Sequence, residues 1–267
     1  MKKYLSFFRL RFLTGLQYRA AALAGIATQF AWGFLEIMVL KAFYETDPSA
    51  YPMTFQASVS YVWLQQAFLA FFATWMLDSE LFDMITNGNI AYELCRPVRI
   101  YSMMMVRNLA NRMSRAVLRC FPILIVAAFL PKPYGISAPL GPVHFLIFLF
   151  AMFLGLFVTV AFFMLVYVLA FYTISPQGLR IVFCSLVEFC SGGVIPLPFF
   201  PAPILRVLEL LPFASMQNVP LRIYGGDIAG EEMVRAIGLQ IFWLIAMMAL
   251  GSFLCRRAER KVALQGG

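Results

Sequence analysis

Few side chains within the long apolar segments of this sequence could do chemistry. Glu188 is the acid placed deepest in such a segment, Glu36 lies near the end of another, and Gln65 and Gln66 stand together in a third. An unpartnered carboxylate or amide is costly in hydrocarbon, so each group needs a hydrogen bond or a polar path to line. We take the four as candidates for a path across a membrane. The alternatives for Glu188 are a buried interhelical hydrogen bond or a neutral carboxyl. Those for Glu36 are an ion pair with Lys41 or extension of the side chain to the membrane interface, and those for the glutamines are helix–helix hydrogen bonds.

A second group consists of arginines. Arg112, Arg115 and Arg119 recur at intervals of three and four residues, so on a helix they share one face. That face could meet lipid phosphates, an acidic substrate or acidic residues of a partner. It could equally anchor a helix at the basic side of a membrane, as the positive-inside rule describes.

Several kinds of chemistry have no basis in this sequence. Gly-Lys never occurs, so there is no G-x-x-x-x-G-K-[ST] loop to bind the phosphates of ATP. The single histidine is His144, and the five cysteines show no C-x-x-C spacing that would hold a metal. We predict no catalytic, cofactor-binding or metal-binding residue, and no cofactor in this chain.

The composition is that of a membrane protein. Of the 267 residues, 62% are hydrophobic and 13% are charged, whereas soluble domains carry roughly 25% charged residues. The net charge of +8 does not indicate a nucleic-acid partner, because the basic residues cluster beside the ends of apolar segments. Their placement predicts membrane lipid as a partner and both termini in the cytoplasm. Five of the 21 lysines and arginines fall on the predicted outer side: Lys41, Lys132, Arg206, Arg222 and Arg235.

The apolar segments predict an all-α polytopic membrane protein with one transmembrane domain over residues 1–267. Residues 1–18 are basic and amphipathic, which predicts an N-terminal interfacial helix or, alternatively, a cytosolic extension of the first span. Six transmembrane helices are predicted, at about residues 20–40, 57–77, 116–130, 143–173, 179–194 and 233–254.

A proline-rich stretch separates the fifth and sixth predicted spans. Four prolines between residues 196 and 203 must end the fifth helix. The apolar run after them, residues 204–211, is about 12 Å long as a helix, well short of the roughly 30 Å of a bilayer core. Residues 195–212 therefore predict a re-entrant helical element on the outer side, or else an ordinary loop with a short interfacial helix.

The longest polar connection, residues 78–107, is predicted to lie in the cytoplasm. Asp78 can cap a short helix whose apolar face comprises Leu81, Phe82 and Ile85, and an Arg96-Pro97 turn follows. No membrane span is available to cover that face, so it predicts a site for docking a partner. The alternative is a loop that lies in the membrane interface.

Three separate points of this sequence resemble the permease subunits of type-2 ABC exporters. Gly192-Gly193 with Pro196, Pro201 and Pro212 is similar to the family signature after the fifth span. The connection that ends at Arg96-Pro97 is similar to the loop carrying the coupling helix. The basic C-terminus ending in residues 265–267 resembles one subfamily with paired permeases.

The resemblance implies a permease subunit that forms half of a translocation path and is driven by a separate ABC ATPase dimer carrying ATP and Mg²⁺. A second permease, either a related chain or a copy, would complete the path in the cell membrane, by this likeness a bacterial plasma membrane. The residues implied in coupling are Asp78, Leu81, Phe82, Ile85, Arg96 and Pro97. Two other functions stay open: an integral-membrane enzyme acting on a lipid-linked substrate, and a self-contained channel.

Overall fold

The computed structural model describes residues 2–47, 51–94, 97–173 and 175–265, and within them every regular element is helical. The all-α prediction is therefore confirmed. The elements are α1 (Lys2–Gly15), α2 (Arg19–Thr46), α3 (Phe55–Ala67), α4 (Leu69–Phe72), η2 (Thr74–Met76), α5 (Ser79–Thr86), α6 (Ile90–Leu94), α7 (Ile100–Phe129), α8 (Pro142–Ala170), α9 (Pro176–Cys190), η3 (Leu197–Phe199), α10 (Ala202–Leu210), α11 (Asn218–Gly225) and α12 (Gly230–Gln265).

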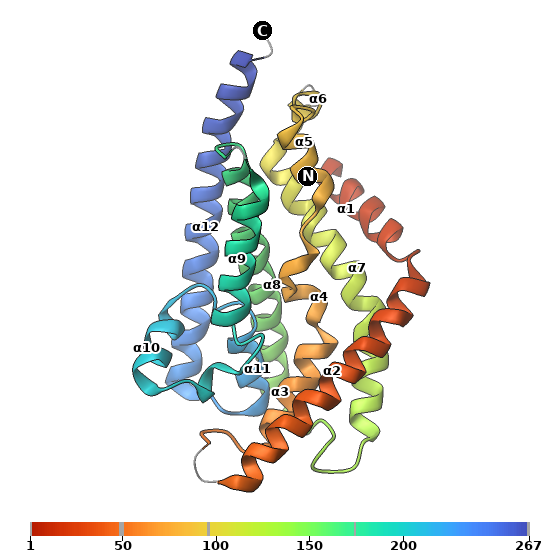
Figure 1. Cartoon of the computed structure of the whole chain (residues 1–267), viewed down its shortest axis with the longest axis vertical. Helices are drawn as coiled ribbons and strands as arrows, with labels where there is room; N and C mark the ends of the chain where they lie inside the picture. The colour runs from red at the N-terminus through yellow and green to blue at the C-terminus, as the bar shows by residue number, and fades with distance from the viewer. Residues whose placement is uncertain (1, 48–50, 95–96, 174, 266–267) are drawn as a thin grey trace.

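The long helices run between two ends of the molecule (Figure 1). Both chain termini lie toward the end that carries α5 and α6, and α10 lies toward the other end. By length and composition, three helices of the described part could cross a membrane: α2, α8 and the part of α12 from Gly230 to Arg260. We call the end with α5 and α6 the termini end and the opposite end the α10 end.

The second predicted span is not one helix. Instead of a continuous helix over 57–77, the structure has α3, α4 and η2, with interruptions at Phe68 and Ala73. No glycine or proline marks either interruption. Arg112 of α7 stabilises the second one, because its Nη1 donates to the carbonyl oxygens of Phe71 at 2.8 Å and Ala73 at 3.0 Å. A distant side chain thus satisfies backbone groups that a continuous helix would have paired within itself.

Helix α7 begins well before the span predicted at 116–130. Its first half contains Arg107 and Arg112, which a membrane segment would normally exclude. Both arginines have partners inside the protein. Arg107 Nε donates to Asp78 at 2.6 Å, and the ring centre of Phe163 lies 5.2 Å from the Arg112 guanidinium carbon. Helix α1 packs along this half of α7, as Figure 1 also shows.

Helix α8 lies at the centre of the bundle, against α12, α11 and α7. Small residues let its neighbours approach closely. A Cβ built on Gly155 would lie 2.0 Å from the carbonyl oxygen of Met216, so only glycine fits there. Nearby, Gln240 Nε2 of α12 donates to the carbonyls of Ala151 at 3.1 Å and Ser215 at 2.9 Å. The loop before α11 is therefore held between α8 and α12.

Candidate functional site

One cavity of about 620 Å³ is lined by all four path candidates: Glu36, Gln65, Gln66 and Glu188. They come from three separate parts of the chain: α2, the interrupted α3–η2 segment and α9. The interruption of the second predicted span brings Ala73 and Thr74 into the same wall. The structure thus gathers into one site the polar groups that the sequence shows only as isolated residues.

Hydrogen bonds fix two of these side chains. The Glu188 carboxylate accepts from Thr74 Oγ1 at 2.6 Å, which joins α9 to η2. Gln65 Nε2 donates to the carbonyl of Gly193 at 2.6 Å, which joins α3 to the loop after α9. Glu188 therefore both makes a partly buried interhelical hydrogen bond and lines the cavity, so the two interpretations of this residue are compatible.

Other polar atoms of the cavity wall are buried and have no hydrogen-bonding partner in the described part of the chain. They are three acceptors, Oε1 of Glu36, Gln29 and Gln65, and one donor, Nε2 of Gln217. Lys41 does not pair with Glu36, as one alternative held, but with Glu45 at 3.5 Å. Buried polar atoms of this kind normally find partners, so the wall is suited to receive a polar group or water.

Gly193 lines one side of the cavity, and Gly192 precedes it in a close contact with α3. Gly192 has a φ of 81°, and a Cβ there would lie 2.6 Å from the Tyr61 hydroxyl, which donates to the Gly192 carbonyl at 3.2 Å. Of the prolines in the predicted re-entrant element, Pro196 and Pro212 are buried and Pro201 is exposed. This segment folds into η3 and α10.

Sequence reasoning missed several residues of the wall. Gln29 and Gln217 are polar residues in apolar surroundings, and this signal could have identified them. Thr74 carries no such signal, because its position depends on the interruption of the helix. Arg119 also lines the cavity, whereas Arg112 of the same predicted face is buried elsewhere. Arg112 and Arg119, which we expected to share one face, therefore have different roles: Arg112 binds backbone carbonyls, and Arg119 lines the cavity.

The predicted docking face of α5 needs a correction. Leu81, Phe82 and Ile85 are only 2%, 7% and 9% exposed, and the Phe82 ring centre lies 4.8 Å from that of Tyr167 on α8. We expected no span to cover this apolar face, but α8 extends far enough to do so. The three side chains stabilise the position of α5 within the chain and leave no apolar face for a partner.

Two other residues predicted to act in coupling lie at opposite ends of the 78–97 stretch. Asp78 lies between α7 and α8, where it accepts from Arg107 and its backbone N–H donates to the Tyr167 hydroxyl at 2.6 Å. Pro97 is exposed, and Arg96 lies outside the described residues. The large hydrophobic side chain that the described part of the stretch exposes is Tyr92 of α6, at 76%.

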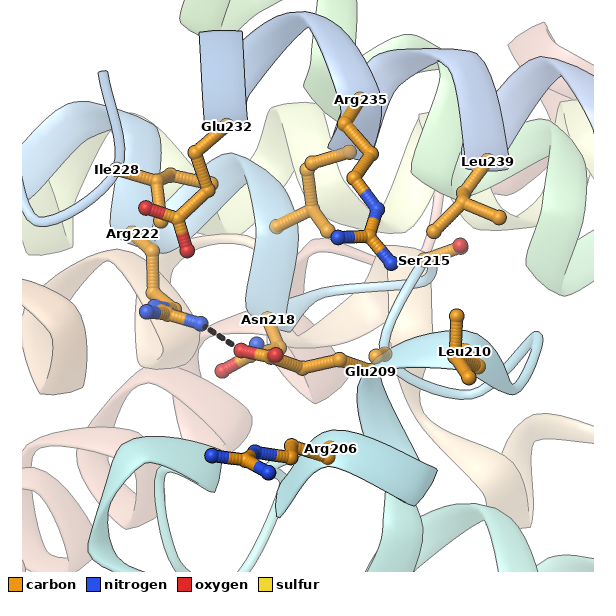
Figure 2. Close-up of a pocket in the computed structure, with 13 residues that line it drawn as sticks. Arg206, Glu209, Leu210, Ser215, Asn218, Arg222, Ile228, Glu232, Arg235 and Leu239 are labelled. Carbon is orange, nitrogen blue, oxygen red and sulfur yellow. Dashed lines mark hydrogen bonds and ion pairs between the residues drawn. The ribbon is translucent and has the colours of Figure 1, made fainter. Parts of the chain in front are cut away.

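A separate pocket of about 410 Å³ lies between α10, α11 and α12 at the α10 end (Figure 2). In it Arg222 donates to Glu209 at 2.6 Å and to Asp227 at 2.5 Å. Burial by itself lowers the pKa of Arg222, but these two carboxylates raise it above its ordinary value, so the arginine stays charged. Arg206 and Arg235 point into the same pocket from α10 and α12. The paired charges stabilise the packing of α10 on α11.

We expect Glu188→Gln to reduce transport while the protein still assembles. Glutamine keeps an acceptor for Thr74 but removes the negative charge from the cavity wall. Substrate flux in proteoliposomes would measure the effect, with Glu231→Gln, an exposed change at the start of α12, as the control. Unchanged flux in Glu188→Gln would show that the carboxylate serves only to join α9 to η2.

The comparison with known families connects this geometry to transport. Residues 29–266 match a family model described as ABC-2 family transporter protein. No curated protein matches the chain. The match covers most of the chain, including every helix that lines the polar cavity, and is thus not confined to one motif. The chain belongs to the ABC-2 transporter family and is a membrane permease component of an ABC transporter.

Proposed function

We propose that this permease forms half of the translocation path of an ATP-driven exporter. The observation that carries the proposal is the cavity of about 620 Å³ lined by Glu36, Gln65, Gln66 and Glu188. Polar groups in the apolar interior of a membrane protein indicate a substrate or water pathway where they line a cavity. Buried polar atoms of the wall without partners support this function for the cavity.

We further propose six membrane passes with both termini in the cytoplasm. The proposed passes are α2, α3 to η2, α7, α8, α9 with the loop after it, and α12, of which α2, α8 and α12 are long and apolar enough to cross a membrane. Helix α9 has 15 residues, so at about 22 Å it needs the residues after it to complete a crossing. Residues 195–212 then form a re-entrant element on the outer side. Termini at the same end are consistent with an even number of passes.

Single introduced cysteines test this topology. In a variant from which the five native cysteines have been removed, a membrane-impermeant thiol reagent should label a cysteine at Lys132 in intact cells. It should label a cysteine at Arg257 only after the cells are opened. The expectation follows from the excess of basic residues at the termini end. Labelling of position 257 but not 132 in intact cells would reverse the orientation.

With this topology the termini end is cytoplasmic, so the work of ATP hydrolysis by a separate ATPase enters the chain there. We propose that the ATPase dimer contacts the exposed surface of α5 and α6. The chain then offers a short mechanical route. Asp78 is held by Arg107 and Tyr167, and η2 immediately precedes it and bears Thr74, the partner of Glu188. Displacement of α5 would therefore move one wall of the cavity.

The complex contains, in this proposal, two ABC ATPase subunits that bind ATP and Mg²⁺ and a second permease, either a related chain or a copy. Purification of the tagged chain in mild detergent from its native host tests it. We expect a P-loop ATPase to co-purify and the complex to hydrolyse ATP. A chain that purifies alone and conducts ions in planar bilayers would instead be a self-contained channel.

A further inference from the structure

A third cavity, of about 460 Å³, lies toward the termini end between α1, α2 and α7. We call it the basic cavity because four arginines line it: Arg11, Arg107, Arg115 and Arg119. It shares one lining residue, Arg119, with the polar cavity described above.

The charges of the basic cavity are not balanced. Its two acids, Asp78 and Glu80, both accept from Arg107. No ion pair involves Arg11, Arg115 or Arg119 within residues 2–47, 51–94, 97–173 and 175–265. Three guanidinium groups therefore face this cavity without a carboxylate, and the cavity attracts anions.

Two buried donors in the wall also have no acceptor in the described chain. Asn108 is 4% exposed; its Oδ1 accepts from Arg112 Nε at 2.9 Å, and its Nδ2 has no partner. Nε of Arg119 is likewise buried without a partner. Leaving a buried donor unpaired is unfavourable, and both residues line the basic cavity, so an acceptor bound there would satisfy them.

The backbone of α2 makes room for one of these donors. A Cβ built on Gly25 would lie 2.5 Å from the Arg119 guanidinium carbon. The glycine thus allows the guanidinium to lie flat against α2, between the two cavities.

Helix α2 also exposes apolar side chains. Leu23 and Trp32 are 68% and 65% exposed, and Trp32 lines the polar cavity. An apolar chain could lie along α2 while an anionic group occupies the basic cavity.

We propose that the basic cavity binds the anionic phosphate head group of a membrane amphiphile and that Arg119 delivers that group to the polar cavity. This inference rests on the proposed function, because it names the substrate class of the same path. Guanidinium groups suit phosphate oxygens through paired N–H donors, and the Asn108 amide supplies another donor. The head group enters from the side of the membrane where α1 lies.

Lipid binding to the purified complex tests the site directly. The complex is placed in nanodiscs that contain phosphatidylglycerol and phosphatidylcholine, and the retained lipid is quantified by native mass spectrometry. We expect Arg115→Gln with Arg119→Gln to reduce retained phosphatidylglycerol at least fivefold. Retained phosphatidylcholine should not change, because its choline cation leaves the head group without net negative charge. Arg257→Gln, which removes an exposed arginine near the C-terminal end of α12, is the matched control and should have no effect.

Asn108→Asp provides a second variant that isolates the unpaired donor. Aspartate keeps an acceptor for Arg112, so the fold is retained, but it places a carboxylate oxygen where the amide donor was. We expect it to reduce phosphatidylglycerol retention to the same extent. Retention equal to wild type in both variants overturns the proposal, and so does an equal loss in Arg257→Gln, since general attraction to basic residues would then explain the binding.

Competition with inorganic phosphate distinguishes a lipid head group from a soluble anion as the ligand of the basic cavity. Excess inorganic phosphate should not displace phosphatidylglycerol from the wild-type complex. Complete displacement would assign the cavity to a soluble anion and overturn the amphiphile as its ligand. ATPase co-purification is measured in the same samples. A wild-type complex that keeps its ATPase but retains phosphatidylglycerol no better than phosphatidylcholine refutes only this inference, whereas absence of the ATPase with normal lipid binding refutes only the proposed function.

Discussion

Arg112→Met is expected to prevent stable folding of this permease. Arg112 is 1% exposed, and its Nη1 donates to the carbonyls of Phe71 and Ala73 where the α3–η2 segment is interrupted. Methionine has a similar reach but no donor, so both carbonyls lose their partner in a buried place. Each orphaned acceptor costs about 1–3 kcal/mol, so the loss is roughly 2–6 kcal/mol, a large fraction of the stability of a typical domain.

The measurement is the yield of monodisperse protein in detergent and the temperature at which it aggregates. Arg112→Lys should lie between methionine and wild type, because an ammonium group keeps the charge but cannot reproduce the planar fork that also reaches Asn108. Arg257→Met is the control, since Arg257 is exposed on α12. Wild-type yield and thermal stability in Arg112→Met would show that the interrupted helix does not depend on this side chain.

Tyr92→Asp is expected to detach the ATPase from an otherwise intact permease. Tyr92 is 76% exposed on α6, the largest apolar side chain that the α5–α6 surface presents. Exposed tyrosines at interface centres frequently contribute about 2 kcal/mol or more, which corresponds to roughly a thirtyfold loss of affinity. Aspartate adds the desolvation cost of an unpaired charge. We expect loss of ATPase co-purification with normal permease yield.

Lys132→Asp, a charge-changing substitution on an exposed loop toward the opposite end, serves as the control for Tyr92→Asp. A change at Phe82 would not serve the same purpose. Phe82 packs on Tyr167 inside the chain, so Phe82→Asp would disturb the docking of α5 before any partner is bound. Normal ATPase recovery with Tyr92→Asp would place the contact elsewhere on the molecule.

The sequence by itself determined that this chain is a helical membrane protein, and it showed which polar residues needed an explanation. Composition and the length of apolar runs suffice for the first, because hydrocarbon solvent admits few alternatives to helices. Glu36, Gln65, Gln66 and Glu188 stood out for the same reason: polar groups in apolar segments need partners. Periodicity could not show that the four line one cavity, because they come from three parts of the chain.

Only the tertiary structure decided where helices are interrupted and which apolar faces are covered. The break at Ala73 has no local signal, because a side chain some forty residues away supplies the donors that make it possible. The apolar face of α5 read as a docking surface because the sequence does not show how far α8 extends beside it. The face shared by Arg112 and Arg119 is divided by packing: one side chain binds backbone carbonyls, and the other lies between two cavities. Helical spacing fixes which residues share a direction, but the neighbours in three dimensions decide what each of them binds.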